Sequence, residues 1–484
     1  MTAILKELYK QATGQDAQSV VKLTGEGSNR IYYRLSSGDT TAIGVVGVSQ
    51  QENRAFISLS RQFAKCGICA PTVLAVSHDE MCYLTDDLGD TTIFTMLKEA
   101  RERGTFNDEE SNALCRVMST LPKIQYEVAR NFDFSLCYPV SSFDRRSVFW
   151  DLNYFKYCFL KGAGIEFDEE KLEDEFEKLS NILLKEECNT FLYRDFQSRN
   201  IMWHNNSPYF IDFQGGRRGP IYYDVASFVG QARAKYTAEV IDKMLDAYLK
   251  ALSEYRNIDK EDFLRKLNIF RIFRLLQNLG TYGYRGLYER KKAFVESIPS
   301  ALAQINTLLE KVKEEFPILH TQLQETSHLP RFRKHDYNSL TVDVISFSYK
   351  RGIPEDYSGN GGGFVFDCRA IHNPGRYEPY KHLTGMDAPV IEFLEKKSNI
   401  AQFLQSAYTM TDEMVDTYLK RGFKHIQICC GCTGGQHRSV YSAEHIARHI
   451  AEKFGVKVIV NHSMQNCCYT IERRESEQDS DVNL

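Results

Sequence analysis

The segment FLYRDFQSRNIMWHNNSPYFIDFQ, residues 191–214, constrains this chain more than any other, because it spaces three polar residues at fixed intervals. Asn200 follows Asp195 by five positions, and Asp212 follows Asn200 by twelve. A carboxylate at Asp195 can orient an attacking hydroxyl group and accept its proton, whereas Asn200 and Asp212 offer the hard oxygen ligands that Mg²⁺ prefers. The spacing therefore predicts transfer of a phosphoryl group from ATP, with Mg²⁺ as the metal.

The pattern on either side of this segment predicts an α+β, bilobal fold like that of protein kinases. The first 90 residues read as two hairpins, RIYYRL to TAIGVVGV and TVLAV to MCYLT, around one helix in QENRAFISLSRQFAKCG. From residue 91 onward the apolar periodicity is helical, apart from a loop-and-strand stretch at 190–220. We therefore expect a β-rich N-lobe at 1–90 and a helical C-lobe at 91–325.

The N-lobe carries the residues that are expected to meet ATP. The glycines of TGEGSNRIYY can bring backbone N–H groups to phosphate oxygens, and YLTDDLGD is the expected hinge, where backbone groups meet adenine. A typical protein kinase also uses a strand lysine on the phosphates, but no lysine occurs here between Lys22 and Lys65. Arg30 and Arg34 are candidate substitutes, and the sequence leaves the choice open. The predicted ATP-binding residues are Gly25, Gly27, Ser28, Asn29, Asp86 and Asp87.

Residues from about 15 to 315 resemble the aminoglycoside phosphotransferase superfamily, and within it the bacterial anomeric kinases of N-acetylmuramate and N-acetylglucosamine. The resemblance rests on ENRAF, LTDDLGDTT, YRDFQSRNIMW and IDFQGGRRGPIYYDVASF. It implies an N-acetylated amino sugar as the acceptor, phosphorylated on its C1 hydroxyl for cell-wall recycling. Gly215 and Gly216 replace the Asp-Ala that usually follows this D-F-Q, which leaves the choice of acceptor open. The implied acceptor-binding residues are Gln197, Arg199, Gln214 and Asp224.

A second motif related to phosphate, GCTGGQHRS, spans residues 431–439. An apolar strand precedes it and an amphipathic helix, SVYSAEHIARHIAEKF, follows it, so the motif predicts a glycine loop that leads into a helix N-terminus. Such a loop presents backbone N–H groups to an anion, and Arg438 can donate two parallel hydrogen bonds to a phosphate. Cys432 and Arg438 also have the spacing of a cysteine-dependent phosphatase, in which a thiolate is the nucleophile.

Residues from about 342 to 462 resemble the C-terminal domain of the RNase adapter protein RapZ. The resemblance rests on VISFSYKRGIP, FVFDCRAIHNPGRYEPYKHLTGMDAPVIEFL and GCTGGQHRSVYSAEHIA. It implies an α/β domain that senses a hexosamine phosphate. This chain departs from the relative in having Gly375 after Asn373-Pro374 and an acidic tail, ERRESEQDSDVNL, which disfavours RNA as a partner. The implied cradle residues are Cys432, Thr433, Gly434, Gly435, His437, Arg438, Ser439, Arg369, Thr384 and Asp387.

Composition and charge agree with a cytoplasmic protein that has no membrane partner. The formal net charge is −4 and the apolar content is 43%, so nothing in the balance favours a nucleic acid or an anionic membrane. No apolar run approaches the roughly 20 residues that span a bilayer. A charged, proline-containing linker is expected at 326–340, the phosphosugar-binding domain at 341–471, and a disordered acidic tail at 472–484.

These patterns predict an ATP-dependent amino-sugar kinase joined to a module that binds an amino-sugar phosphate. Two alternatives stay open. One is a regulatory RNA-binding adapter whose kinase lobe is only a sensor, and the other is a kinase fused to a phosphatase that uses Cys432. The sequence settles neither the oligomeric state nor whether the two domains communicate.

Overall fold

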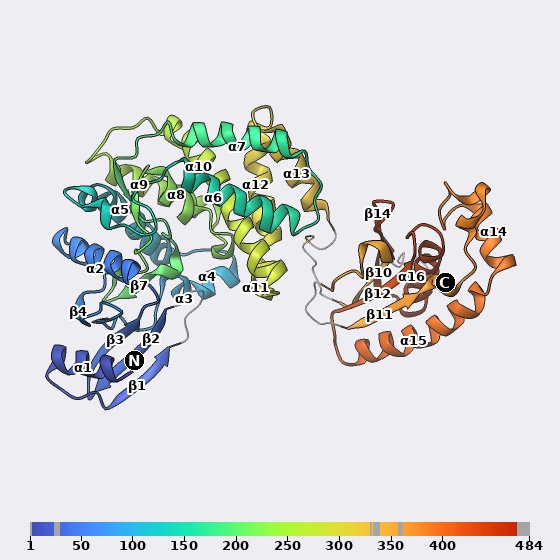
Figure 1. Ribbon diagram of the computed structural model, residues 1–484, viewed down its shortest axis with the longest axis horizontal. Coiled ribbons are helices and arrows are strands. Elements are labelled where there is room, and N and C mark those ends of the chain that lie inside the picture. The colour runs from blue at the N-terminus through green and yellow to red at the C-terminus, as the bar shows by residue number, and fades with distance from the viewer. Residues whose placement is uncertain (1, 24–29, 330–331, 333–338, 357–361, 472–484) are drawn as a thin grey trace, which may run out of the picture. The chain divides into compact units, whose positions relative to one another are not determined.

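The computed structural model describes residues 2–23, 30–329, 332, 339–356 and 362–471. The chain divides into two compact units, Met1–Ser327 and His328–Leu484, and the division falls inside the stretch expected to be a linker (Figure 1). Each unit is described by itself. Within the described ranges, no helix combines the length and the apolar character needed to cross a membrane.

The first lobe of unit 1 is a five-stranded antiparallel sheet in the order β1-β2-β3-β5-β4. Helix α1 (Thr2–Thr13) packs Leu5, Leu8 and Tyr9 into the core of this sheet. The helix predicted after the first hairpin is α2 (Gln50–Lys65), which buries Phe56 and Phe63. The strands are β1 (Ser19–Leu23), β2 (Ile31–Ser37), β3 (Thr40–Val46), β4 (Val73–Val76) and β5 (Cys82–Asp86).

The second lobe is helical, which confirms the predicted kinase-like fold class. Two short hairpin-like sheets, β6 (Thr190–Leu192) with β9 (Arg217–Gly219) and β7 (Ile201–His204) with β8 (Ser207–Phe210), interrupt the helices and carry the loops that hold Asp195 and Asp212. The helices are α3 (Ile93–Met96), α4 (Lys98–Arg103), α5 (Asp108–Ala129), α6 (Arg145–Tyr154), α7 (Glu169–Leu183), α8 (Tyr222–Val229), α9 (Ala238–Leu252), α10 (Lys260–Tyr282), α11 (Lys292–Val295), α12 (Ile298–Leu309) and α13 (Pro317–His328).

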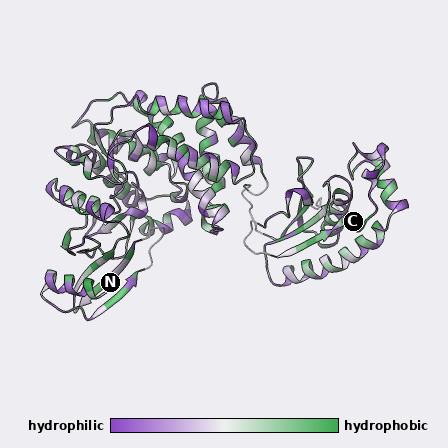
Figure 2. Ribbon diagram, in the orientation of Figure 1, coloured by the Kyte–Doolittle hydropathy of each residue, from purple (hydrophilic) through white to green (hydrophobic). Residues whose placement is uncertain are grey.

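Unit 2 is the mixed α/β domain that the sequence predicts. Its five-stranded sheet has the order β11-β12-β10-β13-β14, with parallel pairing except between β13 and β14. Strands β10 and β12 are buried along nearly their whole length, and Figure 2 shows apolar residues along this central sheet. The elements are β10 (Thr341–Ser348), β11 (Gly363–Asp367), α14 (Ala388–Lys397), α15 (Ile400–Lys420), β12 (His425–Cys432), α16 (Arg438–Phe454), β13 (Lys457–His462) and β14 (Cys467–Ile471).

Helix α10 crosses the chain near residues 154–159 at backbone contact, and two glycines make the contact possible. A Cβ atom added at Gly283 would lie 2.3 Å from the carbonyl oxygen of Cys158, and one at Gly280 would lie 2.9 Å from the backbone nitrogen of Phe155. Backbone atoms cannot swing away as the end of a flexible side chain can. The close approach therefore depends on the absence of side chains at both positions.

We predict that Gly283→Ala lowers the free energy of unfolding of the protein by about 1–3 kcal/mol, the usual cost of overpacking a tight contact. Chemical denaturation followed by circular dichroism would measure the change. The matched control is Thr281→Ala, which removes atoms on the same helix and should have a much smaller effect. Equal stability of Gly283→Ala and wild type would show that the two segments separate easily.

Candidate active site and phosphate cradle

A buried carboxylate shapes the loop that carries the predicted base. Asp224, in the first turn of α8, accepts hydrogen bonds from the backbone N–H groups of Tyr193 at 2.7 Å and Arg194 at 2.9 Å. Arg194 has a φ of 76°, a conformation rare for residues with a side chain, so the loop needs this external support. Asp224 is 0% exposed. Both of these contacts serve the loop that Asp224 holds, and its implied acceptor-binding role stays a prediction.

Asp195, Asn200 and Asp212, whose spacing predicted a phosphoryl-transfer site, lie close together in the structure. Asn200 donates from Nδ2 to the carbonyl oxygen of Asp195 at 2.9 Å and to Oδ2 of Asp212 at 3.3 Å. Strand β8 ends two residues before Asp212, which has a φ of 63°. Strained backbone of this kind clusters at functional sites. With Nδ2 used in these bonds, Oδ1 is the atom of Asn200 that can coordinate a metal.

The electrostatics around Asp212 suit a bound cation. Burial raises the pKa of Asp212, the charge of Asp195 raises it further, and the hydrogen bond from Gln214 lowers it. A cation beside such a carboxylate favours its charged form. The side-chain oxygens of Asn200 and Asp212 are ligands of the kind that Mg²⁺ takes. The described residues contain no group of three His, Cys, Asp or Glu side chains suited to a metal.

The other implied acceptor residues divide between two roles. Gln214 donates from Nε2 to Oδ1 of Asp212 at 2.7 Å, so it orients the carboxylate that is the candidate metal ligand. Gln197 is half-buried and Arg199 is exposed, and both stand in the short turn between Asp195 and Asn200. Gln197 and Arg199 therefore stay candidates for contact with the acceptor.

Sequence reasoning missed a buried group of charged residues behind Asp195. Arg217 is 1% exposed and donates from Nε and Nη2 to the carbonyl oxygen of Gly215 at 3.2 Å each. Its Nη1 has no hydrogen-bond partner among the described residues. Asp151 of α6 lies 3.6 Å from Arg194. Burial and the neighbouring Arg194 lower the pKa of Arg217 to about 10. The motif RRGP was visible in the sequence, but its burial was not.

Gly215 leaves space directly beside the predicted base. A Cβ atom added there would lie 3.5 Å from Cδ of Arg194 and 4.0 Å from Oδ2 of Asp195, which is ordinary contact distance. A Cβ atom at Gly216 would instead lie 2.3 Å from the ring of Phe191. The two glycines that depart from the superfamily pattern thus differ: Gly215 borders the reaction site, whereas Gly216 permits tight packing.

The predicted ATP-binding residues are only partly described. Gly25, Gly27, Ser28 and Asn29 lie outside the described residues. Asp86, at the end of β5, accepts a hydrogen bond from the backbone N–H of Thr72 at 2.7 Å. Asp87 accepts from Nε of Arg34 at 2.7 Å. Both carboxylates are engaged with the protein, and contact of adenine with the backbone of this segment stays a prediction.

In unit 2, the predicted cradle forms at the carboxyl end of β12. Cys432 ends the strand, and its Sγ accepts a hydrogen bond from the N–H of Gly435 at 3.2 Å and lies 3.1 Å from Oγ of Ser439. Burial raises the pKa of the thiol, but hydrogen bonds from Ser439 and from the backbone of Gln436 and Gly435 outweigh it, and the net pKa is lowered. The loop therefore stabilises negative charge at its centre.

Arg438 braces the cradle through part of its guanidinium. It is 5% exposed, and its Nη1 donates to the carbonyl oxygens of Arg369 at 2.8 Å and Ile371 at 2.9 Å, which ties the 369–371 turn to the helix. Its Nε is buried and has no hydrogen-bond partner among the described residues. The predicted grip of Arg438 on a phosphate through two parallel hydrogen bonds stays a prediction.

The remaining cradle residues frame the loop. His437 bonds through Nε2 to the carbonyl oxygen of Tyr380 at 2.8 Å, and Thr433 and Gly434 are exposed at the mouth. Asp387 accepts from the N–H of Thr384 at 2.6 Å and from its hydroxyl at 2.9 Å, so this pair closes its own turn. The turn adjoins the cradle through a hydrogen bond of 2.9 Å from the N–H of Gly385 to the carbonyl oxygen of Gln436.

Arg369 belongs to the rim rather than to the floor of the cradle. It pairs with Asp367 at 2.7 Å, and its guanidinium carbon lies 4.0 Å from the centroid of the Tyr349 ring. Gln436, which the sequence did not single out, donates from Nε2 to the carbonyl oxygens of Lys381 at 3.0 Å and Leu383 at 2.7 Å. Gln436 therefore fixes the loop to the 381–383 segment, and no local pattern around it would have predicted that contact.

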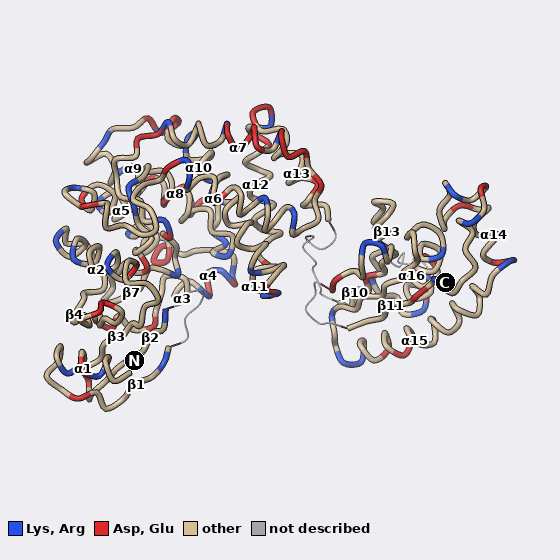
Figure 3. Tube along the Cα trace, viewed as in Figure 1, with Lys and Arg blue, Asp and Glu red and all other residues tan. Residues whose placement is uncertain are grey.

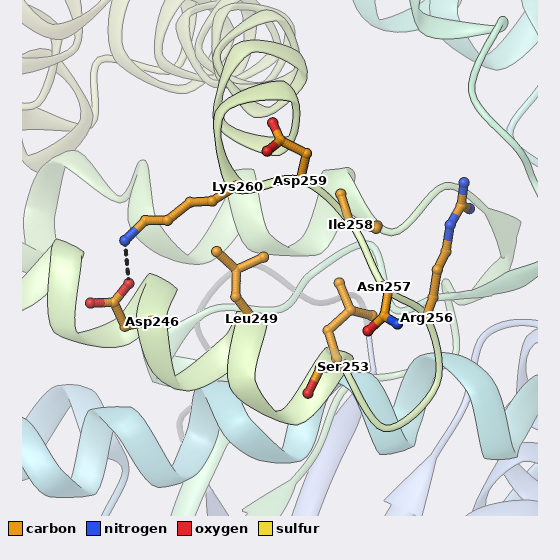
Figure 4. Close-up of a pocket in the computed structure, with 9 residues that line it drawn as sticks. Asp246, Leu249, Ser253, Arg256, Asn257, Ile258, Asp259 and Lys260 are labelled. Carbon is orange, nitrogen blue, oxygen red and sulfur yellow. Dashed lines mark hydrogen bonds and ion pairs between the residues drawn. The ribbon is translucent and has the colours of Figure 1, made fainter.

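One surface hollow lies away from both sites. It has a volume of about 440 Å³ and lies where α9 leads into α10, with Lys260 paired to Asp246 across it at 2.6 Å (Figure 4). None of the predicted site residues lines it. Figure 3 shows basic and acidic residues interspersed along the helices of both units.

Comparison with known proteins finds a matching family model for each unit. The model of the phosphotransferase enzyme family matches residues 19–261, and the model of the RapZ C-terminal domain matches residues 340–466. A nucleotide-binding protein of Delftia acidovorans is 32% identical over 171 residues, which are 34% of this chain and 54% of that protein. One of Acidithiobacillus ferrooxidans is 39% identical over 127 residues, which are 26% and 40% of the two chains. The chain thus spans about half the length of these curated relatives or less.

Solved kinases of small molecules resemble unit 1. The aminoglycoside phosphotransferase APH(2'')-Ib with bound ADP has a TM-score of 0.44 and 18% identity, covering 67% of this chain and 98% of that one. A choline kinase from Cryptosporidium parvum has a TM-score of 0.44 and 13% identity, covering 67% and 100%. These values carry no argument about the acceptor.

Asp224 supplies a prediction about pH. Burial raises the pKa of Asp224 to about 7, although hydrogen bonds from Tyr193 and Arg194 lower it. A carboxyl whose pKa is higher in the folded state stabilises the fold at low pH, and loses that contribution as the pH rises through the folded value. With about 3.9 as the unfolded pKa, the loss between pH 4 and pH 7 amounts to about 4 kcal/mol.

We therefore expect the stability of Asp224→Asn, which cannot titrate, to depend less on pH than that of wild type over this interval. Urea denaturation at a series of pH values would measure the difference. The exposed Asp242→Asn is the control and should follow wild type. A wild-type profile parallel to that of Asp224→Asn would mean that Asp224 stays charged throughout.

Proposed function

The chain belongs to the phosphotransferase enzyme family, and on that premise we propose that unit 1 is an ATP-dependent kinase of a free N-acetylated amino sugar, acting on its C1 hydroxyl. The convergence of Asp195, Asn200 and Asp212 carries the kinase part of this proposal. The motifs IDFQ and RRGPIYYDVAS support the acceptor. The product would be a sugar 1-phosphate, as in the recycling of cell-wall sugars.

The residues of this chain divide the work of such a reaction. Asp195 accepts a hydrogen bond from the attacking hydroxyl, orients it and takes its proton as the new bond to the γ-phosphorus of ATP forms and the bond to the bridging oxygen breaks, which releases ADP. Asp224 holds the backbone of Tyr193 and Arg194 so that Asp195 keeps its position. Asp212, oriented by Gln214, and Oδ1 of Asn200 would hold Mg²⁺, which neutralises charge on the phosphates. Gly215 leaves room for a sugar beside Asp195.

The proposed acceptor is tested by identifying which sugar is phosphorylated and which of its hydroxyl groups carries the phosphate. We expect incubation with ATP and Mg²⁺ to phosphorylate N-acetylated hexosamines in a panel of free sugars, aminoglycosides and choline, with phosphorus NMR identifying the product. A C1 phosphate is a hemiacetal phosphate and hydrolyses in mild acid, whereas a 6-phosphate does not. An acid-stable product, or turnover of aminoglycosides or choline alone, would contradict the proposed acceptor but leave the kinase assignment intact.

Asp195→Asn should lower kcat by about 10²–10⁴-fold, the usual cost of losing a positioned base, with little change in ATP affinity. Asp212→Asn is the companion variant and should weaken binding of ATP in the presence of Mg²⁺ as well. Steady-state kinetics together with calorimetric ATP titration separates the two effects. Near-normal turnover of Asp195→Asn would show that the loop of Asp195 has no catalytic role.

For unit 2, we propose that the cradle binds an amino-sugar phosphate without hydrolysing it. The glycine loop at the N-terminus of α16, with the unused Nε of the buried Arg438, supports an anion site. The match to the RapZ C-terminal domain supports the hexosamine moiety. RNA stays a disfavoured partner, and nanomolar binding of a structured RNA at physiological salt would favour the adapter alternative.

A cysteine-dependent phosphatase is the second candidate for unit 2, and one observation favours it. Ser439 and the N–H of Gly435 both contact Sγ of Cys432, and the pKa of that thiol is lowered. These contacts are what a nucleophilic thiolate needs. The exposed fraction of Cys432 is only 3%, which disfavours attack on a bound phosphate.

Cys432→Ser separates the two candidates. In a binding cradle this variant should retain affinity for glucosamine 6-phosphate or an N-acetylhexosamine phosphate, since the serine keeps the hydrogen bonds. In a phosphatase it would abolish phosphate release while the ligand still binds. Calorimetry and a phosphate-release assay on the same samples give both readouts, with Cys429→Ser, a buried cysteine on the same strand, as the control. Phosphate release that depends on Cys432 would overturn the binding proposal.

A further inference from the structure

Unit 1 lacks the strand lysine with which kinases contact the ATP phosphates. Another cation of the N-lobe is therefore needed in its place. Arg34 does not meet it. Its guanidinium donates to Asp87 at 2.7 and 3.0 Å and to Asp90 at 2.9 and 3.0 Å, so two carboxylates already share its charge. The hydrogen bonds that Arg34 donates to Asp90 and Asp87 raise its pKa. The structure therefore removes one of the two substitutes that the sequence left open.

Arg30 occupies the place that the reaction requires. Its side chain is 2% exposed, and its Nη2 lies 3.0 Å from Oε1 of Glu52 in the first turn of α2. Protein kinases build the same kind of pair, between the strand lysine and a glutamate of the helix that follows the third strand. Helix α2 is that helix here, since it follows β3 directly.

An aromatic stack connects Arg30 to the metal-binding aspartate. The Arg30 guanidinium lies 6.0 Å from the ring centroid of Phe56, and Phe56 stacks on Phe213 with centroids 4.9 Å apart and planes at 4°. Phe213 directly follows Asp212 in the chain. The stacked rings of Phe56 and Phe213 therefore link Arg30 to the residue next to Asp212, the carboxylate that would hold Mg²⁺ on the phosphates.

The strand pairing explains how a residue just before β2 can replace one of β3. Ile31, the first residue of β2, pairs with Val46, the last residue of β3, in an antiparallel register. Arg30 precedes Ile31 and so stands at the end of β3 that leads into α2. An arginine suits this position, because its planar guanidinium can pair with a carboxylate and still offer donors to phosphate oxygens.

We propose that Arg30, held by Glu52, binds the α- and β-phosphates of ATP in place of the missing strand lysine. This inference rests on the proposed kinase function. The segment 24–29 plays no part in it, because Arg30, Glu52 and Asp212 all lie within the described residues. Arg30 is a nucleotide-binding residue, and Glu52 is a positioning residue that acts through it.

The test compares nucleotide binding with nucleoside binding. In the full chain, Arg30→Met should weaken binding of ATP and ADP with Mg²⁺ by about 10- to 150-fold, as expected for loss of a charge-assisted hydrogen bond. Binding of adenosine, which has no phosphate, should not change. Calorimetry measures the nucleotides and ligand-observed NMR measures adenosine. Arg30→Lys should recover part of the lost affinity for ATP. Glu52→Gln should lower the affinity for ATP less than Arg30→Met does.

Arg54→Met is the matched control, because Arg54 lies on the same helix as Glu52 and pairs with Glu80 at the surface. It should bind ATP as wild type does. The double variant Arg30→Met/Glu52→Gln removes both charges of the pair together and replaces the single variant if that does not fold. Unchanged ATP affinity in these variants, or equal losses of ATP and adenosine, would overturn the role of Arg30. Failure of wild type itself to bind ATP would instead reject the proposed kinase and this inference with it.

Discussion

The catalytic loop of unit 1 depends on one buried carboxylate, Asp224, which accepts the backbone N–H groups of Tyr193 and Arg194. Without these bonds the positive φ of Arg194 would have no compensation, and the next residue, Asp195, would lose its direction. Because Asp224 belongs to α8, whose residues are all buried, the position of the predicted base follows from the packing of the helical lobe.

The second lobe and the first are tied through aromatic rings at Asp212. Phe213 lies between Phe56 and Phe63 of α2, with centroid distances of 4.9 and 4.7 Å. Tyr83 of β5 stacks on the other face of Phe56 at 4.9 Å. Stacked rings of this size contribute stabilisation beyond their buried area. The stack fixes α2 relative to Asp212, and with α2 it fixes Glu52 and its partner Arg30.

The sequence predicted what is local and missed what depends on distant partners. The kinase-like fold class and the strand–loop–helix of the cradle follow from periodicity and glycines within short segments. The roles of Asp224 and Arg438 could not be predicted, because their partners lie 30 or more positions away in the chain. The same holds for Arg30 and Arg34, because the sequence RIYYRL does not show how their roles differ. Only the folded chain shows that Arg34 meets Asp87, which is 53 residues away.

In the cradle of unit 2, the thiolate of Cys432 and a bound phosphate would compete for the same stabilisation of negative charge. The N-terminus of α16 and the loop N–H groups stabilise negative charge, and Sγ of Cys432 already uses the N–H of Gly435. A phosphate bound at the same helix end would place a second negative charge near the thiolate and would raise the pKa of Cys432. By linkage, a protonated thiol would bind the phosphate more tightly than a thiolate does. A cysteine that must lose its charge for tight binding suits a cradle that holds a phosphate, whereas a phosphatase needs the thiolate and the phosphate together.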